Sequence, residues 1–572
     1  MDEGAAMTTA RTSRGHTLKR SALTIGIAAL VAGCSSDASG GADAAALPDS
    51  GAGESDSGTT DAGAAHVTES VVVTVDLSSS AGSVRDLFGV NKKPTAYDAK
   101  DTNNSYDVSA AYRAFGISQV RLHGDDGIDL CAIYKDAKIE DYASGSPVVV
   151  STCTADTSGG PPHLKWTVKD PSKVNDVANY RFTELDAALA SLVGSGVAPY
   201  VRLGHFYNGV NDVGDTASWA KVAVNIYKHI IGTFAPSATK LSPAHVEVFN
   251  EPDGMFWVGA KADFYALFNA TVDGVRAAAT AAGNTVSVGG PGFTAQYLTK
   301  LKSSTSTANG FVGAVTAARL DFFSVHSYDD CATATLANGE LFLKNVRAEI
   351  NTQGLSSTPM HISEWNIGLG KACGEAFYAT AQVQSYASGM LSLMQDPQYN
   401  IEAAHFFAGV QPMSLFAVDK TNVGKVMVRP VAWSLWAHSK LRAGSRYAAQ
   451  VCASEKCESS TTAGGAVVAL AGSASGKRYA IVANDKDVSI SITLRVTKGV
   501  SSGKFTIFTP PSTEQTVAAT KLGAASYIVD DATMAALIAT VAPVIQEGVV
   551  ANGGLETNVS LFARGIALVE LP

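Results

Sequence analysis

Residues 245–252 read HVEVFNEP, a short run in which valines alternate with polar residues until the chain reaches Pro252. Such alternation predicts a β-strand, and a proline, which has no backbone N–H to donate, favours its end. Asn250 and Glu251 therefore follow the strand directly. A polar residue after a strand is ordinary in a loop, so Glu251 becomes informative only if the fold brings several strand ends together.

Similar strand-like runs recur between residues 85 and 410, and segments with helical periodicity lie between them. In one segment, residues 261–283, apolar side chains follow helical spacing: Phe264, Leu267, Phe268, Val272 and Val275. The repeated pattern predicts an α/β fold with a parallel sheet, and eight units indicate a (β/α)8 TIM barrel with a large insertion at 128–172. The eight strand candidates are residues 87–91, 117–124, 198–205, 245–252, 285–292, 320–328, 359–366 and 401–410.

The pattern changes after residue 425, where short β-rich runs are separated by glycine, serine and aspartate turns. This arrangement is typical of an antiparallel β-sandwich. Residues 66–79, HVTESVVVTVDLSS, form another strand candidate that is expected to pair into the same sandwich. We therefore expect N-terminal strand residues at 66–84, the barrel at 85–425 and a C-terminal β-sandwich domain at 426–572.

The first 65 residues have the character of export and linker sequence. The basic segment RTSRGHTLKR precedes SALTIGIAALVAG, an apolar stretch of 13 residues that is too short to span a bilayer. It ends in LVAGC, which resembles the lipobox of bacterial lipoproteins. We expect a lipoprotein signal peptide at 1–34 with lipidation of Cys34, the alternative being an ordinary signal peptide cleaved nearby. Residues 35–65 are acidic and rich in serine, glycine and alanine, which predicts a flexible linker. The protein is thus expected to be exported and anchored to a membrane, facing the periplasm or the cell exterior.

Composition narrows the class of protein. Hydrophobic residues make up 46% of the 572 residues and charged residues 17%, which is typical of soluble globular domains. The net charge is -9 and the body of the chain has no cluster of lysine and arginine, so nucleic acid is not an expected partner. A membrane is expected as a partner only through the N-terminal lipid.

Six cysteines remain when Cys34 is set aside. An even number in an exported protein favours disulfide bonds, and pairing of nearest neighbours is one of 15 connectivities. Their spacings fit no zinc-binding pattern. The six are Cys131, Cys153, Cys331, Cys373, Cys452 and Cys457.

Two glutamates meet at one mouth if the barrel prediction holds. In a (β/α)8 barrel, functional side chains lie at the carboxyl ends of the strands. Glu251 follows the fourth strand candidate, and Glu364, within HISEWN, ends the seventh. Retaining glycoside hydrolysis needs such a pair: one protonated carboxyl group donates to the leaving oxygen and the other attacks the anomeric carbon. This chemistry requires no cofactor and no metal.

The motifs FNEPDGMFW, VSVGGPG, FFSVHSYDD and HISEWN, in this order, resemble those of clan A glycoside hydrolases. They are most similar to family 39, the family of β-xylosidases and α-L-iduronidases, over roughly residues 85–445. The resemblance implies a retaining glycosidase that cleaves a β-xyloside-like or related glycoside by double displacement. Glu251 would be its general acid/base and Glu364 its nucleophile, and an oligosaccharide, polysaccharide or simpler glycoside would be its substrate.

The resemblance also implies roles for polar residues around the two glutamates. Asn250 would bind the sugar 2-hydroxyl, Arg121 would keep the nucleophile ionised, and His123 would contact sugar hydroxyls. His326 would line the pocket, and Tyr328 would donate a hydrogen bond to the nucleophile. For Arg121, His123 and His326, a structural role inside the barrel is the alternative.

Aromatic and cationic residues bear on the choice of sugar. Trp257 and Trp365 are candidates for sugar stacking, but a buried tryptophan is equally ordinary core material. Arg202 stands where relatives carry an acid, and Phe406 and Phe407 stand where relatives supply a tryptophan. An arginine near the pocket would favour an acidic sugar such as a uronate, or it pairs with a neighbouring carboxylate.

Two other classes of function fit parts of the sequence. One is a non-catalytic carbohydrate-binding lipoprotein on a TIM-barrel scaffold, which would be expected to have lost one of the two glutamates. The other is a structural or adhesion lipoprotein, which accounts for the anchor but not for the ordered motifs. A glycosidase accounts for both glutamates and for the motifs around them.

Overall fold

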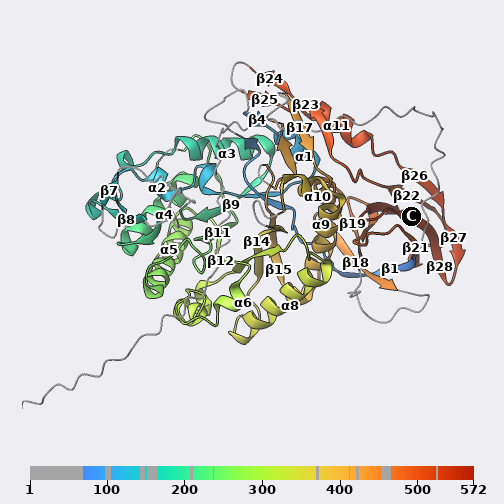
Figure 1. Cartoon of the computed structure of the whole chain (residues 1–572), viewed down its shortest axis with the longest axis horizontal. Helices are drawn as coiled ribbons and strands as arrows, with labels where there is room; N and C mark the ends of the chain where they lie inside the picture. The colour runs from blue at the N-terminus through green and yellow to red at the C-terminus, as the bar shows by residue number, and fades with distance from the viewer. Residues whose placement is uncertain are drawn as a thin grey trace, which may run out of the picture.

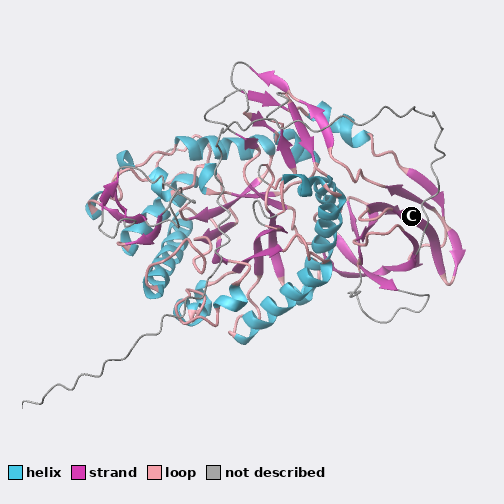
Figure 2. Cartoon of the chain, viewed as in Figure 1, coloured by secondary structure: helices cyan, strands magenta, loops and turns pink. Residues whose placement is uncertain are grey.

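The computed structural model shows a barrel joined to a β-rich domain (Figure 1). Its helices surround the barrel strands, whereas strands dominate the C-terminal part of the chain (Figure 2). The structure describes residues 69–96, 105–141, 148–150, 164–205, 210–235, 237–368, 373–410, 413–419, 424–452, 466–522 and 526–572.

Eight parallel strands close into a barrel in the order β11-β12-β13-β14-β15-β2-β5-β9. Each predicted strand corresponds to one of them, so the predicted α/β fold and TIM barrel are confirmed. The strands are β2 (Gly89–Asn91), β5 (Gln119–Arg121), β9 (Ala198–Leu203), β11 (His245–Val248), β12 (Ser287–Phe293), β13 (Phe323–Asp329), β14 (Met360–Ile367) and β15 (Ile401–Phe406).

Amphipathic helices cover the barrel because their apolar stripes face its strands. In α5, the predicted stripe from Phe264 to Val275 is buried. At the start of α4, the Asp215 carboxylate accepts a hydrogen bond from the backbone N–H of Ser218 and so caps the helix. The helices are α1 (Ser109–Ala114), α2 (Leu130–Ile133), α3 (Thr183–Ser195), α4 (Thr216–Ile230), α5 (Lys261–Ala281), α6 (Tyr297–Lys300), α7 (Phe311–Val315), α8 (Leu336–Thr352), α9 (Ala381–Met394), α10 (Pro430–Ser439) and α11 (Asp531–Ala539).

One helix, α10, stands shortly after residue 425, where the barrel was expected to end. Helix α10 lies in the segment assigned to the sandwich, yet Trp433 and Trp436 belong to the same buried cluster as the barrel residues. Proline at the first turn fits the start of a helix. The side chain of Ser434 also donates to the carbonyl of Gln384 on α9, at 2.7 Å. Helix α10 therefore packs against α9 within a buried cluster that also includes residues of the C-terminal sheet.

The C-terminal domain is built on a ten-stranded sheet in the order β26-β22-β29-β20-β19-β18-β1-β21-β28-β27. Strand β1 pairs antiparallel with β18 and parallel with β21, and all other pairs in the sheet are antiparallel. Alternate residues Val71, Val73 and Val75 contribute to a second buried cluster. The strands are β1 (Glu69–Ser83), β18 (Ser445–Cys452), β19 (Val467–Ala474), β20 (Lys477–Asn484), β21 (Ile490–Lys498), β22 (Lys504–Phe508), β26 (Val544–Glu547), β27 (Val549–Ala551), β28 (Gly554–Leu561) and β29 (Ile566–Leu571).

Three small sheets complete the described architecture. The predicted insertion supplies three strands of the sheet β10-β8-β6-β7, and the other two sheets have the orders β16-β17-β23 and β24-β25-β4-β3. Their strands are β3 (Thr95–Ala96), β4 (Tyr106–Asp107), β6 (Ala137–Asp141), β7 (Val148–Val150), β8 (Leu164–Val168), β10 (Val210–Val213), β16 (Phe416–Val418), β17 (Lys425–Val428), β23 (Gln515–Ala518), β24 (Thr520–Leu522) and β25 (Ser526–Ile528).

One expected disulfide, Cys331–Cys373, is present and links the loop after β13 to the loop after β14. Cys131 and Cys452 are also disulfide-bonded, and the cysteines nearest to them in the sequence, Cys153 and Cys457, lie outside the described residues. The signal peptide at 1–34 with Cys34 and the linker at 35–65 lie outside them too. In the described parts of the chain, no helix combines the length and apolar character that crossing a bilayer requires.

Candidate active site

Glu251 reaches the barrel mouth through a sharp change of direction after β11. Phe249 and Glu251 both adopt positive φ angles, 80° and 45°, which are uncommon for non-glycine residues. The backbone N–H of Glu251 donates to the carbonyl of Gly292 at 2.9 Å. Gly292 itself has φ 64°, and a Cβ there would lie 3.1 Å from Nε2 of His326. The glycine of the VGGPG motif thus lets the backbone approach the site closely.

The structure brings Glu251 and Glu364 together, although they are far apart in the sequence. Glu364 lies on β14, and one carboxylate oxygen of each glutamate lies within 4.8 Å of the other. His326, on β13, lies between them: its Nδ1 is 2.6 Å from Oε1 of Glu251 and 3.5 Å from Oε2 of Glu364. The site therefore contains two adjacent carboxyl groups that share one imidazole.

Glu364 is held in its ionised form. Arg121 donates to its Oε1 at 2.7 Å, and the Tyr328 hydroxyl donates to its Oε2 at 2.7 Å. Burial by itself would raise the pKa of Glu364. The positive charges of His326 and Arg121 and the hydrogen bonds from Tyr328 and Arg121 outweigh burial, so the pKa of Glu364 lies below its ordinary value. The expected contacts of Arg121 and Tyr328 with this carboxylate are both present.

Arg121 bonds both Glu364 and Asn250, the residue before Glu251. It also contacts a third carboxylate, Glu247, which was not predicted from the sequence. Its guanidinium is fully buried and lies 2.6 Å from Oε2 of Glu247 on β11. It also donates to Oδ1 of Asn91 at 3.1 Å and to Oδ1 of Asn250 at 2.7 Å. A charged residue between the valines of HVEV was the available signal, because inward-facing positions of a barrel strand alternate with outward-facing ones.

Two of the predicted sugar-binding residues lie in this network. Nε2 of His123 lies 2.7 Å from Oδ1 of Asn91 and 3.0 Å from the Arg121 guanidinium. Burial, followed by the positive charges of Lys92 and Arg121, lowers the pKa of His123 well below its ordinary value, so this imidazole is neutral. The bond from Arg121 to Oδ1 of Asn250 fixes the orientation of that amide beside Glu251.

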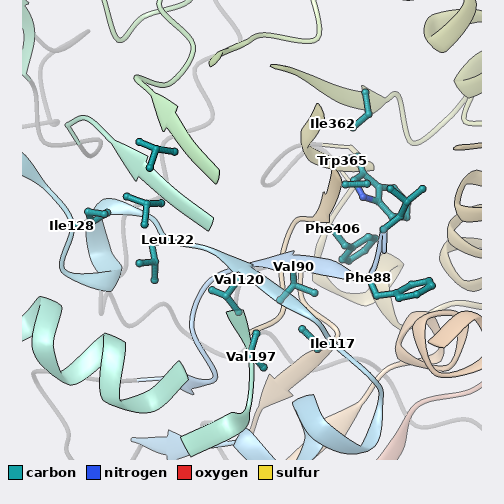
Figure 3. Close-up of a cluster of buried hydrophobic side chains, with 14 of the residues drawn as sticks. Phe88, Val90, Ile117, Val120, Leu122, Ile128, Val197, Ile362, Trp365 and Phe406 are labelled. Atoms are coloured by element: carbon teal, nitrogen blue, oxygen red, sulfur yellow. The ribbon is translucent and has the colours of Figure 1, made fainter. Parts of the chain in front are cut away.

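The two tryptophans proposed for sugar stacking lie in the core instead. Trp365 is 1% exposed and packs edge-on against Phe406 in a cluster of buried hydrophobic side chains (Figure 3). Trp257 is 5% exposed and packs edge-on against Phe249 and Phe264. Neither has a free ring face, so the stacking expectation is corrected for both.

Phe407 is the aromatic residue that contacts the polar network. Its ring centroid lies 5.5 Å from that of His123 and 6.2 Å from that of Tyr328, both in edge-to-face geometry. It follows the last residue of β15, and it is only partly buried. The ring at the eighth strand is therefore Phe407, whereas Phe406 belongs to the core.

Arg202, on β9, is buried beside the network. Its Nη1 donates to the carbonyl of His205 at 2.9 Å, and among the described residues it takes part in no salt bridge. Burial, and then the positive charge of Arg121, lowers the pKa of Arg202 to about 10. The expected alternative of a direct carboxylate partner is not realised among these residues.

Glu251, His326 and Glu364 are close enough to one another to ligate a cation. The oxygens of Glu364 already accept hydrogen bonds from Arg121 and Tyr328. The guanidinium charge opposes a second cation at that carboxylate. The arrangement therefore suits acid–base and nucleophilic chemistry better than metal binding.

Comparisons with known proteins agree with this architecture. Residues 167–406 match the sequence profile described as "Glycosyl hydrolases family 39". No curated protein sequence matches the chain. Three solved structures share its fold at low sequence identity, which indicates architecture and not substrate.

The first is a glucosidase from Croceicoccus marinus, with 17% identity, a TM-score of 0.59 and coverage of 87% of this chain and 98% of that one. The second is an α-L-arabinofuranosidase from Thermotoga maritima, with 13% identity, a TM-score of 0.55 and coverage of 88% and 99%. The third is a family 39 enzyme from Xanthomonas axonopodis pv. citri, with 15% identity, a TM-score of 0.54 and coverage of 89% and 98%. The profile match over residues 167–406 indicates a glycosidase similar to family 39 glycoside hydrolases, and the solved structures share its fold.

Proposed function

We propose that this glycosidase hydrolyses its substrate with retention of anomeric configuration, by double displacement. The observation that carries the proposal is the approach of the two carboxylates to within 4.8 Å. Retaining enzymes place these groups about 5–5.5 Å apart, whereas inverting enzymes separate them by about 6.5–9.5 Å to admit a water molecule. The short spacing supports direct attack of one carboxylate on the sugar.

Glu364 is the proposed nucleophile. A nucleophilic carboxylate must be ionised before it attacks, and Arg121, Tyr328 and His326 favour that state. Oε1 is bound by Arg121, whereas Oε2 lies on the side of His326 and Glu251. Formation of the glycosyl ester removes the charge of Glu364, and the buried pair of Arg121 and Glu247 keeps the guanidinium neutralised during that step.

Glu251 is the proposed acid/base, assisted by His326. The contact of 2.6 Å between its Oε1 and Nδ1 of His326 places one proton between the two groups. That proton protonates the leaving oxygen in the first step, and Glu251 then activates water in the second. Asn250, held by Arg121, is proposed to bind the sugar 2-hydroxyl.

Product stereochemistry tests the mechanism directly. We expect at least one aryl glycoside of a panel containing xyloside, glucoside, arabinoside, glucuronide and iduronide to be cleaved with retention. The anomeric configuration of the first product, recorded by ¹H NMR before mutarotation, should be the same as that of the substrate. A first-formed product of opposite configuration would contradict the retaining mechanism while leaving the fold unaffected.

Acidic sugars are a second candidate substrate class, favoured by Arg202. This buried arginine has no salt bridge among the described residues, and lies close enough to Glu247 and Glu364 to sense their charges. A uronate carboxylate would supply the missing counter-charge. Turnover of the xyloside and not of the glucuronide or iduronide in the same panel would rule this alternative out.

His326 should set the alkaline limb of the pH profile. Burial lowers its pKa, but the charges of Glu364 and Glu251 and the hydrogen bond to Glu251 outweigh burial and raise it above the ordinary value. The imidazole of His326 therefore keeps its proton to higher pH than an ordinary histidine. We expect His326→Gln to move the alkaline limb of kcat/KM to lower pH by on the order of one unit.

The matched control is His229→Gln, because His229 pairs with Asp186 on the outer helices at 2.8 Å and lies outside this network. Its pH profile should coincide with that of the unmodified enzyme. An unchanged alkaline limb in His326→Gln would show that the shared proton does not govern activity.

A further inference from the structure

A second cluster of ligating side chains lies at the other end of the barrel. His245 is the first residue of β11, His361 the second residue of β14, and Glu402 the second residue of β15. The ligating atoms of the three residues lie within 4.8 Å of one another. Because all three residues stand at the amino ends of parallel strands, they form part of the barrel floor, opposite the mouth that carries Glu251 and Glu364.

The separations within this floor cluster are compatible with metal ligands, although His361 and Glu402 are within hydrogen-bonding distance of each other. Nε2 of His361 lies 3.3 Å from Oε2 of Glu402, and Nε2 of His245 lies 3.9 Å from Oε1 of the same carboxylate. The first distance is that of a long hydrogen bond, and the second exceeds hydrogen-bonding range. Two ligand atoms bound tetrahedrally to one Zn²⁺ at about 2.0–2.1 Å would lie roughly 3.4 Å apart. Glu402 is half exposed, so a small movement of its carboxylate would bring both separations to the spacing of tetrahedral zinc ligands.

The surroundings of His361 fix its ring in a suitable orientation. Phe322 stacks on it with a centroid distance of 3.8 Å and an interplanar angle of 10°. Its Nδ1 lies 3.1 Å from the Tyr200 hydroxyl. With the proton on Nδ1, the ring donates to that oxygen and presents the Nε2 lone pair toward Glu402, which is how metal-binding histidines are usually supported.

The cluster brings β11 together with the neighbouring strands β14 and β15, with which β11 forms no hydrogen-bonded ladder in the described part of the chain. Strand β11 is three positions from β14 and four from β15 around the closed barrel. An ion bound to all three residues would link opposite walls across the floor. Solvent can reach such an ion from the side of Glu402, so water can take a remaining coordination position.

We propose that His245, His361 and Glu402 bind a late first-row divalent cation, Zn²⁺ above all, as a structural ion that closes the barrel floor. Two imidazoles and one carboxylate suit Zn²⁺ and Co²⁺, whereas Mg²⁺ and Ca²⁺ prefer oxygen ligands throughout. The ion takes no part in sugar chemistry, because the glutamates of the active site lie at the other end of the barrel.

The test uses the full chain, freed of metal with a chelator and then titrated with ZnCl₂, CoCl₂ or MgCl₂. We expect Zn²⁺ to raise the Tm by on the order of a few degrees at saturation, one ion per chain to survive gel filtration, and Co²⁺ to give visible absorption. Mg²⁺ should give none of these effects. Absence of a Tm shift with both Zn²⁺ and Co²⁺ would overturn the proposal.

Matched variants locate the ion. Glu402→Gln, a conservative change at a half-exposed position, should abolish the Zn²⁺-dependent Tm shift and the Co²⁺ absorption while glycoside hydrolysis continues unchanged. Asp186→Asn removes the carboxylate of a two-residue pair with His229 and should preserve both signals.

Glu251→Gln alters the other group of side chains that could hold a cation, the one in the active site. Signals lost in Glu251→Gln but kept in Glu402→Gln would place the ion in the active site and overturn the floor site.

Discussion

Replacement of Glu364 by alanine is expected to reduce kcat on every glycoside by about 10⁵- to 10⁶-fold, the scale seen when a covalent nucleophile is removed. The carboxylate that forms the glycosyl ester is lost, and the neighbouring Glu251 cannot replace it because it must protonate the leaving group. Arg121 keeps its bond to Glu247, so the barrel should still fold. Steady-state kinetics with aryl glycosides measure the loss.

Azide separates loss of the nucleophile from general damage. In Glu364→Ala, azide can enter the space left by the carboxylate and give a glycosyl azide of configuration opposite to that of the substrate. Glu547→Ala is the control, because this carboxylate lies on β26 of the C-terminal sheet and pairs with Lys504 at 2.6 Å. Turnover by Glu364→Ala at the level of that control would refute the assignment.

Replacement of Glu251 by alanine is expected to act on leaving-group departure. For alkyl glycosides, whose oxygen needs a proton to leave, kcat/KM should fall by about 10²- to 10⁴-fold. For aryl glycosides that leave as stable phenolates, the fall in kcat/KM should be much smaller. The ratio of the two losses is the measurement, because a folding defect would reduce both equally.

Azide again gives a distinct result. In Glu251→Ala it attacks the glycosyl ester on Glu364 and should yield a glycosyl azide with the configuration of the substrate. The two alanine variants are therefore expected to give azides of opposite configuration from one substrate. The same configuration from both would contradict the division of roles.

The barrel could be predicted from the sequence because its strands are short, apolar and regularly separated by amphipathic helices. Each local pattern is weak, but eight in succession leave few alternatives to a closed parallel barrel. Helix α10 was missed because a helix buried on all sides lacks an amphipathic stripe. PVAWSLWAHS therefore resembles the apolar runs of the following sheet.

Glu251 and Glu364 were predictable because each stands in a motif at the carboxyl end of a strand. Glu247 was not predicted, although its place between two valines puts it on the opposite face of the strand, because in an open sheet that face would be in water, whereas in a closed barrel it is the interior. The same reasoning applies to His245 in the barrel floor. These residues acquire partners only through strands that lie far apart in the sequence, so no spacing marks them.

Trp365 shows where strand periodicity could have corrected the prediction. Successive side chains of a strand point to opposite faces, so an inward-facing Glu364 requires its neighbour to point outward. Trp365 accordingly packs with the residues between strands and helices (Figure 3). The aromatic residue that does reach the site is Phe407, which follows the end of β15. It stands, with Phe406, where relatives supply a tryptophan.

The position of β1 determines the order in which the molecule can be assembled. Val72 of β1 pairs with Cys452 and with Thr493, so the barrel sequence lies entirely between this strand and its neighbours. During synthesis β1 emerges first but remains without partners until the barrel has left the ribosome. A shortened enzyme that begins at the barrel would lack a central strand of the C-terminal sheet. Residues 69–83 must therefore be retained in any minimal version of the protein.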